Sequence, residues 1–407
     1  MRMRVCLGEG RYPRVYTGSV KTVLAVAPPK GARSGLYVFS FTDDYSVFDY
    51  GKMPDRIRGK GSALAVVTAY LFEQMEDPAS WRKVARSRVW ERLGGRETRE
   101  LFGKGRLGSL LGREGLRTHY KGIVDAEGRV VTTRELDRPS RLLLVEAVPV
   151  LRPERGVLAG SEVWNYNGFH AKAGPYLVPL ENVVRFGVPK GSSLIERVTA
   201  DPSYGRQLGL EGPPEPGSWL SSPLLEFFTK LEPSDRHLSL ESALNFSGLS
   251  NREFSELMQR SLLAALFLYA LLYEKGLELW DGKFEFFKAG KGLVLADSIT
   301  PDEVRLTFQG KQLSKELLRQ YYKHYDGEFC RAISEAKKLP MGALGSLKDI
   351  LNERFDVRPR RLDPEFRVAV EELYRSLAKR ITGLDIFGPT RDLEELVGVL
   401  DKWGVTD

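Results

Sequence analysis

A short segment near residue 280 constrains the fold of this chain more than any other part of its sequence. In Trp280-Asp-Gly-Lys-Phe-Glu-Phe286 the charged residues alternate with glycine and aromatic residues. Side chains of a β-strand point alternately to opposite faces, so this pattern predicts a strand with Asp281, Lys283 and Glu285 on one face. A second apolar strand, Gly292–Asp297, follows after a short loop and ends in an aspartate. The sequence therefore predicts two neighbouring strands that bring several charges together.

The two carboxylates Glu285 and Asp297 point to a particular chemistry. Mg²⁺ is bound in proteins by one or two carboxylates together with phosphate oxygens, so two acids at the ends of neighbouring strands suit a Mg²⁺ and phosphate site. An edge hairpin with solvated, alternating charges explains the same spacing equally well. The residues alone leave both interpretations open.

Two further polar segments follow predicted strands. Thr42–Asp49, which precedes Gly59-Lys-Gly61, has the acidic and hydroxyl residues of a binding loop, although spacing alone favours a capped turn. Arg185 ends a predicted strand before the Gly191-Ser192 loop. Guanidinium groups and loop N–H groups both bind oxyanions, which suits capture of a phosphate or carboxylate. In the structural alternative, Arg185 pairs with Glu181.

Hydrophobic periodicity predicts the remaining elements. Strands are expected at residues 15–26, 35–42, 141–151, 180–186, 277–287 and 292–297, with a hairpin over 122–135. Helices are expected at 62–75, 251–275, 363–383 and 390–403. The third helix has Asp363 as its N-cap and Gly383 at its end. Residues 152–178 and the proline-containing stretch 201–217 are expected to be irregular.

The positive charge of the chain is concentrated in one segment. The 407 residues carry a net charge of +7, and residues 81–121 hold twelve Lys or Arg against four Glu, so this segment has +8 and the rest −1. Basic residues interleaved with aromatic ones, here Trp81, Trp90, Phe102 and Tyr120, are typical of non-specific RNA binding. Charge runs are more often solvated faces, so nucleic acid is the less favoured partner.

Absent signatures exclude several classes of protein. The sequence has no GxxxxGK[ST], HExxH or GxSxG motif, which removes support for P-loop, metalloprotease and hydrolase sites. Gly59-Lys-Gly61 is followed by Ser62-Ala-Leu64 and so fails the GxGxxG pattern of a Rossmann site. The longest apolar run, Leu262–Tyr273, is well short of the roughly 20 residues of a membrane-spanning helix. Two cysteines and the lack of a signal-peptide core predict a cytoplasmic protein. Few Asn and Gln residues suggest a thermophilic source.

Taken in order, these segments resemble the SAICAR synthetase family, the ATP-dependent ligases of purine biosynthesis also called phosphoribosylaminoimidazole-succinocarboxamide synthases. The resemblance covers residues 16 to about 320 and is carried by Tyr16–Thr22, Thr42–Asp49, Gly59–Gly61, Thr118–Tyr120, Pro179–Arg185, Gly191-Ser192, Phe228–Lys230, Asp235, Asp281–Phe286 and Ala296–Arg305. The chain departs from the family pattern at Ser19, where the family has Lys, and at Ser298, where it has Glu. The chain is also long for the family, which makes it a divergent, longer member.

The resemblance implies an α+β protein with two lobes and ATP in the cleft between them. We expect an N-terminal antiparallel β lobe over residues 1–150, with the basic segment inserted at about 80–121. A larger α/β lobe over 151–330 would carry the substrate and metal sites, and residues 331–407 would form a C-terminal helical extension. The strand-rich first third agrees with this division, and the boundary is expected in the irregular stretch 150–178.

The resemblance also implies a reaction and its residues. ATP would activate the carboxylate of carboxyaminoimidazole ribonucleotide as an acyl phosphate, which the amine of L-aspartate attacks. The residues expected to bind ATP are Gly18, Lys21, Glu285 and Asp297, the last two also as Mg²⁺ ligands. The expected catalytic residues are Lys283, Arg185 and Asp49. The residues expected to bind substrate are Asp44, Ser46, Lys60, Arg185, Ser192, Lys230, Asp235 and Arg305.

Three alternatives stay open. The chain could be a divergent relative that ligates or phosphorylates a different carboxylate and amine pair, or a nucleotide-binding protein with an RNA-binding basic insertion. Ser19 and Ser298 also leave open a catalytically silent relative with a regulatory role. Except in the RNA-binding case, the expected partners are small-molecule substrates, and no association with a membrane is expected. Assembly into a homo-oligomer is left open.

Overall fold

Two large antiparallel sheets organise the computed structural model, which describes residues 3–6, 11–91, 93, 100, 105–172, 174–290, 292–339 and 346–406. The first sheet has the strand order β1-β2-β3-β6-β4-β5, and each neighbouring pair is antiparallel. Its strands are β1 (Arg14–Thr17), β2 (Lys21–Ala27), β3 (Gly35–Phe41), β4 (Tyr120–Val124), β5 (Val130–Val131) and β6 (Leu142–Ala147). The expected N-terminal antiparallel sheet is therefore confirmed.

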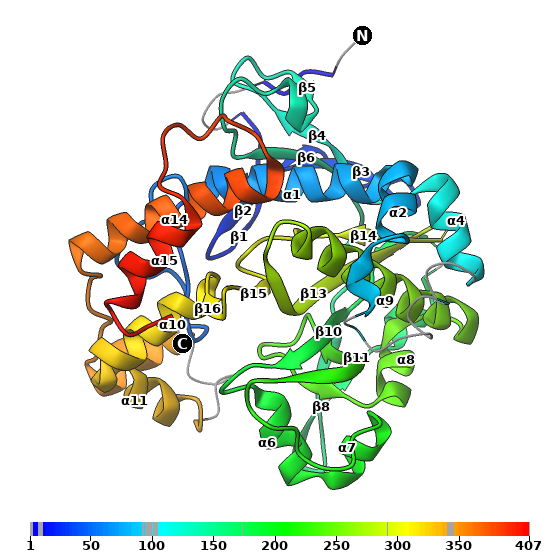
Figure 1. Ribbon diagram of the computed structural model, residues 1–407. Helices are drawn as coiled ribbons and strands as arrows, with labels where there is room; N and C mark the ends of the chain where they lie inside the picture. The colour runs from blue at the N-terminus through cyan, green and yellow to red at the C-terminus, as the bar shows by residue number, and fades with distance from the viewer. Residues whose placement is uncertain are drawn as a thin grey trace.

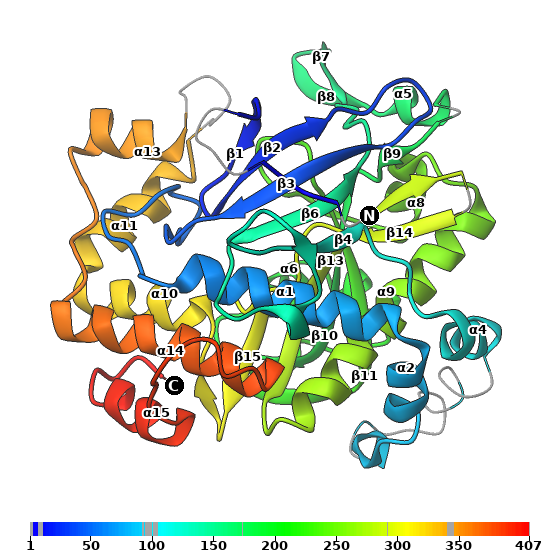
Figure 2. The same ribbon diagram turned by 90° about the horizontal axis from the view of Figure 1, so that it is seen from above.

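Local sequence explains where these strands break. The strand expected at 15–26 is divided into β1 and β2 by a turn in which the Gly18 N–H donates to the Lys21 carbonyl at 2.9 Å. The predicted hairpin at 122–135 is present as β4 and β5, followed by the short helix η2 (Thr133–Glu135). Helix α1 (Lys60–Glu76), predicted at 62–75, packs on β3, β4 and β6 (Figures 1 and 2).

The second sheet is built around one central strand, β13. Its order is β12-β11-β10-β13-β15-β16, and β9 and β14 pair with β13 outside this path. The strands are β9 (Tyr176–Leu177), β10 (Leu180–Val188), β11 (Ser218–Thr229), β12 (His237–Leu238), β13 (Glu278–Ala289), β14 (Gly292–Ala296), β15 (Val304–Phe308) and β16 (Lys311–Gln312). The strands predicted at 277–287 and 292–297 are thus β13 and β14, and they pair with Glu285 opposite Ala296.

A long apolar helix packs against this second sheet. The helix predicted at 251–275 is α9 (Asn251–Tyr273), which begins at a capping box between Ser250 and Glu253. It follows α8 (Leu240–Ser247) and contacts β10, β11, β13 and β14. Among the described helices, α9 is long and apolar enough to cross a membrane, but 67% of its most apolar window is buried inside the protein. Its contacts are those of a core helix.

The prediction of irregular structure at 152–178 is wrong. This stretch contains the hairpin β7 (Glu154–Leu158) and β8 (Ser161–Asn165), the short helix α5 (Asn167–His170) and β9. Most side chains of the hairpin are exposed. Without a buried face there is no apolar alternation, which is the signal by which a strand is recognised in a sequence.

Part of the stretch 201–217 is also regular. Helix α6 (Ser193–Ala200) is followed directly by α7 (Pro202–Gln207), which has Pro202 at its first position and Asp201 as N-cap. Proline is well tolerated at the first helical position because its missing N–H has no partner there. The prolines of this stretch predict a loop, but Pro202 instead begins a helix.

The described part of the basic segment is mostly helical. It forms α2 (Pro78–Val84), the short helix η1 (Arg88–Glu91) and α4 (Arg106–Glu114). Its glycine-rich middle lies outside the described residues. Asp77 caps α2 by accepting hydrogen bonds from the backbone N–H groups of Ala79 and Ser80.

The C-terminal residues form helices, of which α14 packs against α1. They are α10 (Lys315–Tyr325), α11 (Gly327–Ala336), α13 (Leu347–Ile350), η3 (Leu351–Phe355), α14 (Pro364–Thr382) and α15 (Leu393–Asp401). Helix α14 has the predicted ends, with Asp363 as N-cap and Gly383 in the left-handed region at its C-terminus. It lies along α1, drawn orange beside blue in Figure 1.

A buried ion pair connects these two helices to the loop after β14. Lys60, the first residue of α1, has no exposed side-chain surface, and its Nζ lies 2.6 Å from the carboxylate of Asp302. The Tyr374 hydroxyl of α14 donates to the same carboxylate at 2.5 Å. Because a buried charge is stable only with a partner, these three side chains depend on one another.

Replacing Asp302 with Ala should therefore lower the free energy of unfolding by about 3–5 kcal/mol, because Lys60 would stay buried without a counter-ion. A matched control is Lys379→Ala, since Lys379 of α14 forms an exposed pair with Asp385. Its loss should cost less than about 1 kcal/mol. Urea denaturation measures both values, and equal stability of the two variants would contradict the role given to Asp302.

Candidate active site

A cavity of about 660 Å³ lies between the two sheets. One wall is the β1–β2 turn and the adjacent sheet, with Gly18 and Lys21. The other wall is β13 and the end of β14, with Lys283, Glu285 and Asp297. The four residues expected to bind ATP thus line one cavity, although they come from opposite ends of the chain. We call this cavity the cleft.

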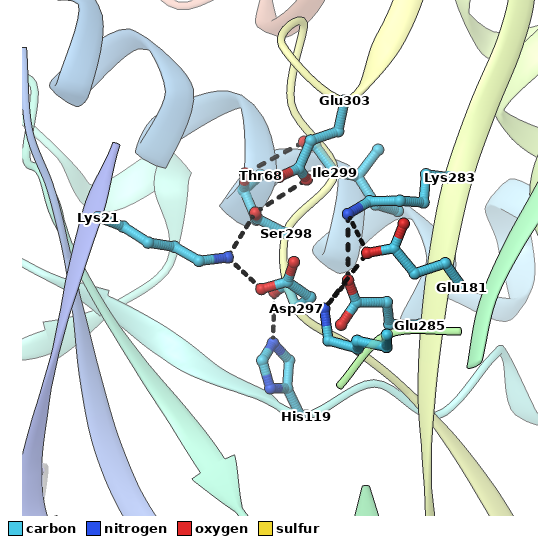
Figure 3. Close-up of polar contacts among 11 residues, drawn as sticks. Lys21, Thr68, His119, Glu181, Lys283, Glu285, Asp297, Ser298, Ile299 and Glu303 are labelled. Carbon is cyan, nitrogen blue, oxygen red and sulfur yellow. Dashed lines mark hydrogen bonds and ion pairs between the residues drawn. The ribbon is translucent and has the colours of Figure 1, made fainter. Parts of the chain in front are cut away.

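The backbone places the acidic side chains along one edge of the cleft. The predicted alternation on β13 is present, so Asp281, Lys283 and Glu285 share a face. Asp297 directly follows β14 and has a φ of 63°, in the left-handed region that few residues other than glycine adopt. Strained backbone of this kind is concentrated at functional sites. Figure 3 shows the Asp297 side chain directed toward Lys21.

Lysine–carboxylate pairs fill the centre of the cleft (Figure 3). They are Lys21 with Asp297, Lys230 with Glu285 (2.5 Å) and Lys283 with Glu181 (2.8 Å). Lys283 also lies 3.3 Å from Glu285. Each pair joins two different elements, so the pairs hold the strands together as well as balancing the charge.

The acidic residues of this group have strongly shifted pKa values. Burial, and the nearby Asp297 carboxylate, raise the pKa of Glu285 to about 7. Burial would also raise the pKa of Asp297, but the charges of Lys21, Lys230 and Lys283 outweigh it and hold that pKa well below its usual range. Of the two neighbours, Glu285 therefore takes up a proton first.

Glu303 also lines the cleft and was missed in the sequence analysis. Its Oε2 accepts a hydrogen bond from the Ser298 hydroxyl at 3.1 Å, and it forms no ion pair with any residue that the structure describes. Burial and the neighbouring Asp297 raise its pKa. Its place in the sequence between Asp302 and Arg305, in the loop that follows β14, could have indicated that it belongs to the site.

His119, from the Thr118–Tyr120 motif, lines the cleft and supports Asp297. Its Nε2 lies 2.8 Å from the Asp297 carbonyl oxygen, and its ring packs edge-on against Phe39 and Phe72. Burial lowers the pKa of His119 to about 4, so the ring is neutral at pH 7. A carbonyl oxygen can only accept, so Nε2 carries the proton and donates it. The histidine fixes the backbone at Asp297.

The structural alternative, in which Arg185 pairs with Glu181, is wrong. The Arg185 guanidinium is buried between Glu226 of β11 and Asp281 of β13, with 2.8 Å to Asp281. The register of the strands explains why Arg185 pairs with Asp281, because the two residues lie directly opposite each other on β10 and β13. Arg305 reaches the same aspartate at 3.7 Å. The sequence-predicted residues Arg185 and Arg305 are thus brought together around Asp281.

Other predicted substrate residues surround this region. Ser192 is buried and caps α6, where its side chain accepts a hydrogen bond from the Leu194 N–H. Asp235 lies between β11 and β12, and its side chain is exposed. The nearby carboxylates of Glu181 and Asp49 contribute to raising its pKa. Asp49 has a φ of 65° and pairs with Lys337 at 2.7 Å.

The cleft is not lined by eight of the predicted residues, namely the five just described (Arg185, Ser192, Asp235, Arg305 and Asp49) and three others. Asp44 pairs with Lys52 and Arg56 beside a different hollow, and Ser46 is buried. Lys60 requires a correction, because its fully buried side chain pairs with Asp302 and donates to the Asp44 carbonyl. A lysine without exposed surface cannot contact a substrate in this arrangement.

The donor set of the cleft fits a magnesium ion that is bound together with phosphate. The described residues contain no group of three or more His, Cys, Asp or Glu side chains arranged to hold a metal. Mg²⁺ needs only one or two carboxylates when phosphate oxygens complete its shell. Glu285 and Asp297 supply such carboxylates, next to lysines suited to phosphate.

Comparison with known proteins places the chain in a family. The family model of SAICAR synthetase matches residues 14–104 and 172–336. A protein of Archaeoglobus fulgidus assigned as a phosphoribosylaminoimidazole-succinocarboxamide synthase is 32% identical over 390 residues, covering 95% of this chain and 99% of that protein. The phosphoribosylaminoimidazole-succinocarboxamide synthase of Thermoplasma acidophilum is 25% identical over 357 residues, covering 85% and 92%.

A solved structure shares the fold. The SAICAR synthase of Saccharomyces cerevisiae, in complex with SAICAR, superposes with a TM-score of 0.51 at 20% identity, covering 92% of this chain and 96% of that one. The extent of the family match and of the relative from Archaeoglobus fulgidus decides the assignment. The chain belongs to the SAICAR synthetase family, the ATP-dependent ligases of purine biosynthesis.

Proposed function

We propose that this protein joins the carboxylate of carboxyaminoimidazole ribonucleotide to the amine of L-aspartate, with ATP and Mg²⁺. The observation that carries the proposal is the group of paired lysines and carboxylates in the cleft between the sheets. Two relatives that match most of the chain bear the name of this activity. In this proposal residues 1–150 form the ATP lobe, 151–330 the substrate lobe and 331–407 a helical extension.

An acyl phosphate accounts for the need for ATP. A carboxylate is a poor electrophile, so its oxygen would first attack the γ-phosphorus and release ADP. The amine nitrogen would then attack the acyl carbon, phosphate would leave, and the nitrogen would lose its proton. Catalysis of such a transfer depends on positioned positive charge around the phosphoryl oxygens.

The nucleotide side of the cleft offers that charge. Gly18 and Lys21, at the β1–β2 turn, would bind the phosphates of ATP. Glu285 and Asp297 would hold Mg²⁺, which would neutralise charge on the transferred phosphoryl group. Lys283, held by Glu181, would contact the phosphoryl group or the amino acid.

The substrate side is built around Arg185. Glu226 and Asp281 hold its guanidinium, and in this proposal Arg185 would bind a phosphate or carboxylate together with Ser192 and Arg305. Lys230 and Asp235 would line the site of the amino acid. Asp49 would face Asp235 from the other side.

The first test is the substrate requirement. ADP should form only when ATP, Mg²⁺, carboxyaminoimidazole ribonucleotide and L-aspartate are all present, and a coupled assay for ADP measures this. Formation of ADP with another amine but not with aspartate would move the protein to the alternative of a divergent ligase. Nucleotide binding without turnover across a panel of amines would favour the silent relative.

The second test addresses the phosphate and metal residues. Lys21→Ala and Asp297→Asn should each lower kcat by at least about 100-fold, because each removes charge beside the transferred phosphoryl group. Circular dichroism should show folded proteins. Arg155→Ala on the exposed β7–β8 hairpin is the control and should keep full activity. Normal turnover of either cleft variant would contradict the site.

The third test uses the metal. Chelation with EDTA should abolish ADP formation, and added Mg²⁺ should restore it. Glu303→Gln removes a carboxylate beside Asp297 that forms no ion pair with the described residues, so it should raise the Mg²⁺ concentration for half-maximal activity several-fold. Glu162→Gln, which changes an exposed acid on β8, should leave the Mg²⁺ requirement unchanged. An unchanged requirement in Glu303→Gln would show that Glu303 contributes nothing to cation binding.

A further inference from the structure

A second cavity, of about 800 Å³, lies in the basic segment and shares no lining residue with the cleft. It is formed by α2, the turn to η1 and the C-terminal end of α9. Its lining residues are Ala79, Arg82, Lys83, Arg86, Ser87, Arg88, Tyr273 and Glu274. Four of these eight carry a positive charge and one a negative charge. We call this cavity the basic pocket.

Most of the positive charge of the basic pocket has no ion-pair partner among the residues that the structure describes. Lys83, Arg86 and Arg88 are exposed and form no ion pair with any residue in the described part of the chain. Arg82 donates to the Gly112 carbonyl at 2.6 Å, and the Glu274 carboxylate accepts from the Ser87 hydroxyl. Like charges gathered in a hollow create a potential that attracts an anion.

The frame that carries these cations is firmly anchored. Trp81 and Trp90 are almost fully buried, and their indole N–H groups donate to the carbonyls of Met75 (2.6 Å) and Val84 (2.9 Å). The Trp81 ring packs on Phe267 of α9 with 4.6 Å between centroids. The side chains around the pocket therefore project from a fixed backbone, which lowers the entropy cost of binding.

The same observations argue against an RNA surface. Trp81, Trp90 and Tyr120 are buried, so they cannot stack on bases, and Phe102 lies outside the described residues. The basic side chains that the structure describes also do not form a continuous track. Arg117 and Lys121 pair with Glu146 on the first sheet, whereas the cations of residues 82–88 surround one hollow.

We propose that the basic pocket binds the phosphate groups of a small phosphorylated molecule, either a nucleoside polyphosphate or an inorganic polyphosphate. Guanidinium groups form paired, charge-assisted hydrogen bonds with phosphate oxygens. The volume lies in the range of small-molecule sites. This inference does not depend on the substrates proposed for the cleft.

Calorimetric titration with ADP and with inorganic tripolyphosphate tests the proposal on the full chain. Arg86→Ala/Arg88→Ala should weaken one binding event at least about tenfold, because two charge-assisted contacts are lost. The matched control is Arg106→Ala/Arg113→Ala, which removes the same charge from the same segment outside the pocket. The control should bind like the wild type, and both variants should keep ligase activity, since none of these arginines lines the cleft.

The two ligands distinguish the source of the phosphate. Tighter binding of ADP assigns a nucleotide and tighter binding of tripolyphosphate an inorganic ligand, and either result supports the pocket. Equal losses in both double variants would show diffuse charge attraction and overturn the proposal. Equal binding by all three proteins, or binding of a single-stranded RNA oligonucleotide without either phosphate ligand, would overturn it too. Arg86→Gln replaces the double variant if circular dichroism shows unfolding.

Discussion

The charges in the cleft are tolerated only because each lysine meets a carboxylate that comes from another part of the chain. Leaving one of them unpaired inside the protein would cost several kcal/mol, roughly the size of a typical protein's whole stability. Strand β13 is the centre of this arrangement, since Asp281, Lys283 and Glu285 pair with residues of β10 and of the end of β11. The same pairs that stabilise the second sheet place its functional groups.

Asp297 connects this arrangement to the rest of the molecule. Lys21 of the first sheet pairs with its carboxylate, and His119 donates to its carbonyl. The loop that follows is fixed as well, because the Thr68 hydroxyl of α1 donates to the Ile299 carbonyl at 3.1 Å and Lys60 pairs with Asp302. Through Tyr374, the C-terminal helix α14 also holds this loop. The C-terminal helices thus help to position a residue of the cleft.

Elements with a strong local signal were predicted well. The alternation on β13 predicted a shared face for Asp281, Lys283 and Glu285, and the last two of these line the cleft. The Asp363 N-cap and Gly383 predicted both ends of α14. The exposed β7–β8 hairpin was missed because an element without a buried face has no apolar period. Single residues were harder. Lys60 stands in a polar motif yet is buried, and Glu303 stands between two motif residues yet reaches the cleft.

The sequence by itself determined the residue types of the site and their order along the chain. It also determined the two neighbouring strands that carry Glu285 and Asp297, because strand periodicity and pairing are local properties. Only the tertiary structure decided the partners. The register of β10 against β11 and β13 decides that Arg185 pairs with Glu226 and Asp281. The packing of one sheet against the other decides that Lys21 meets Asp297. Such contacts join positions far apart in the chain, and no local pattern encodes the distance between them.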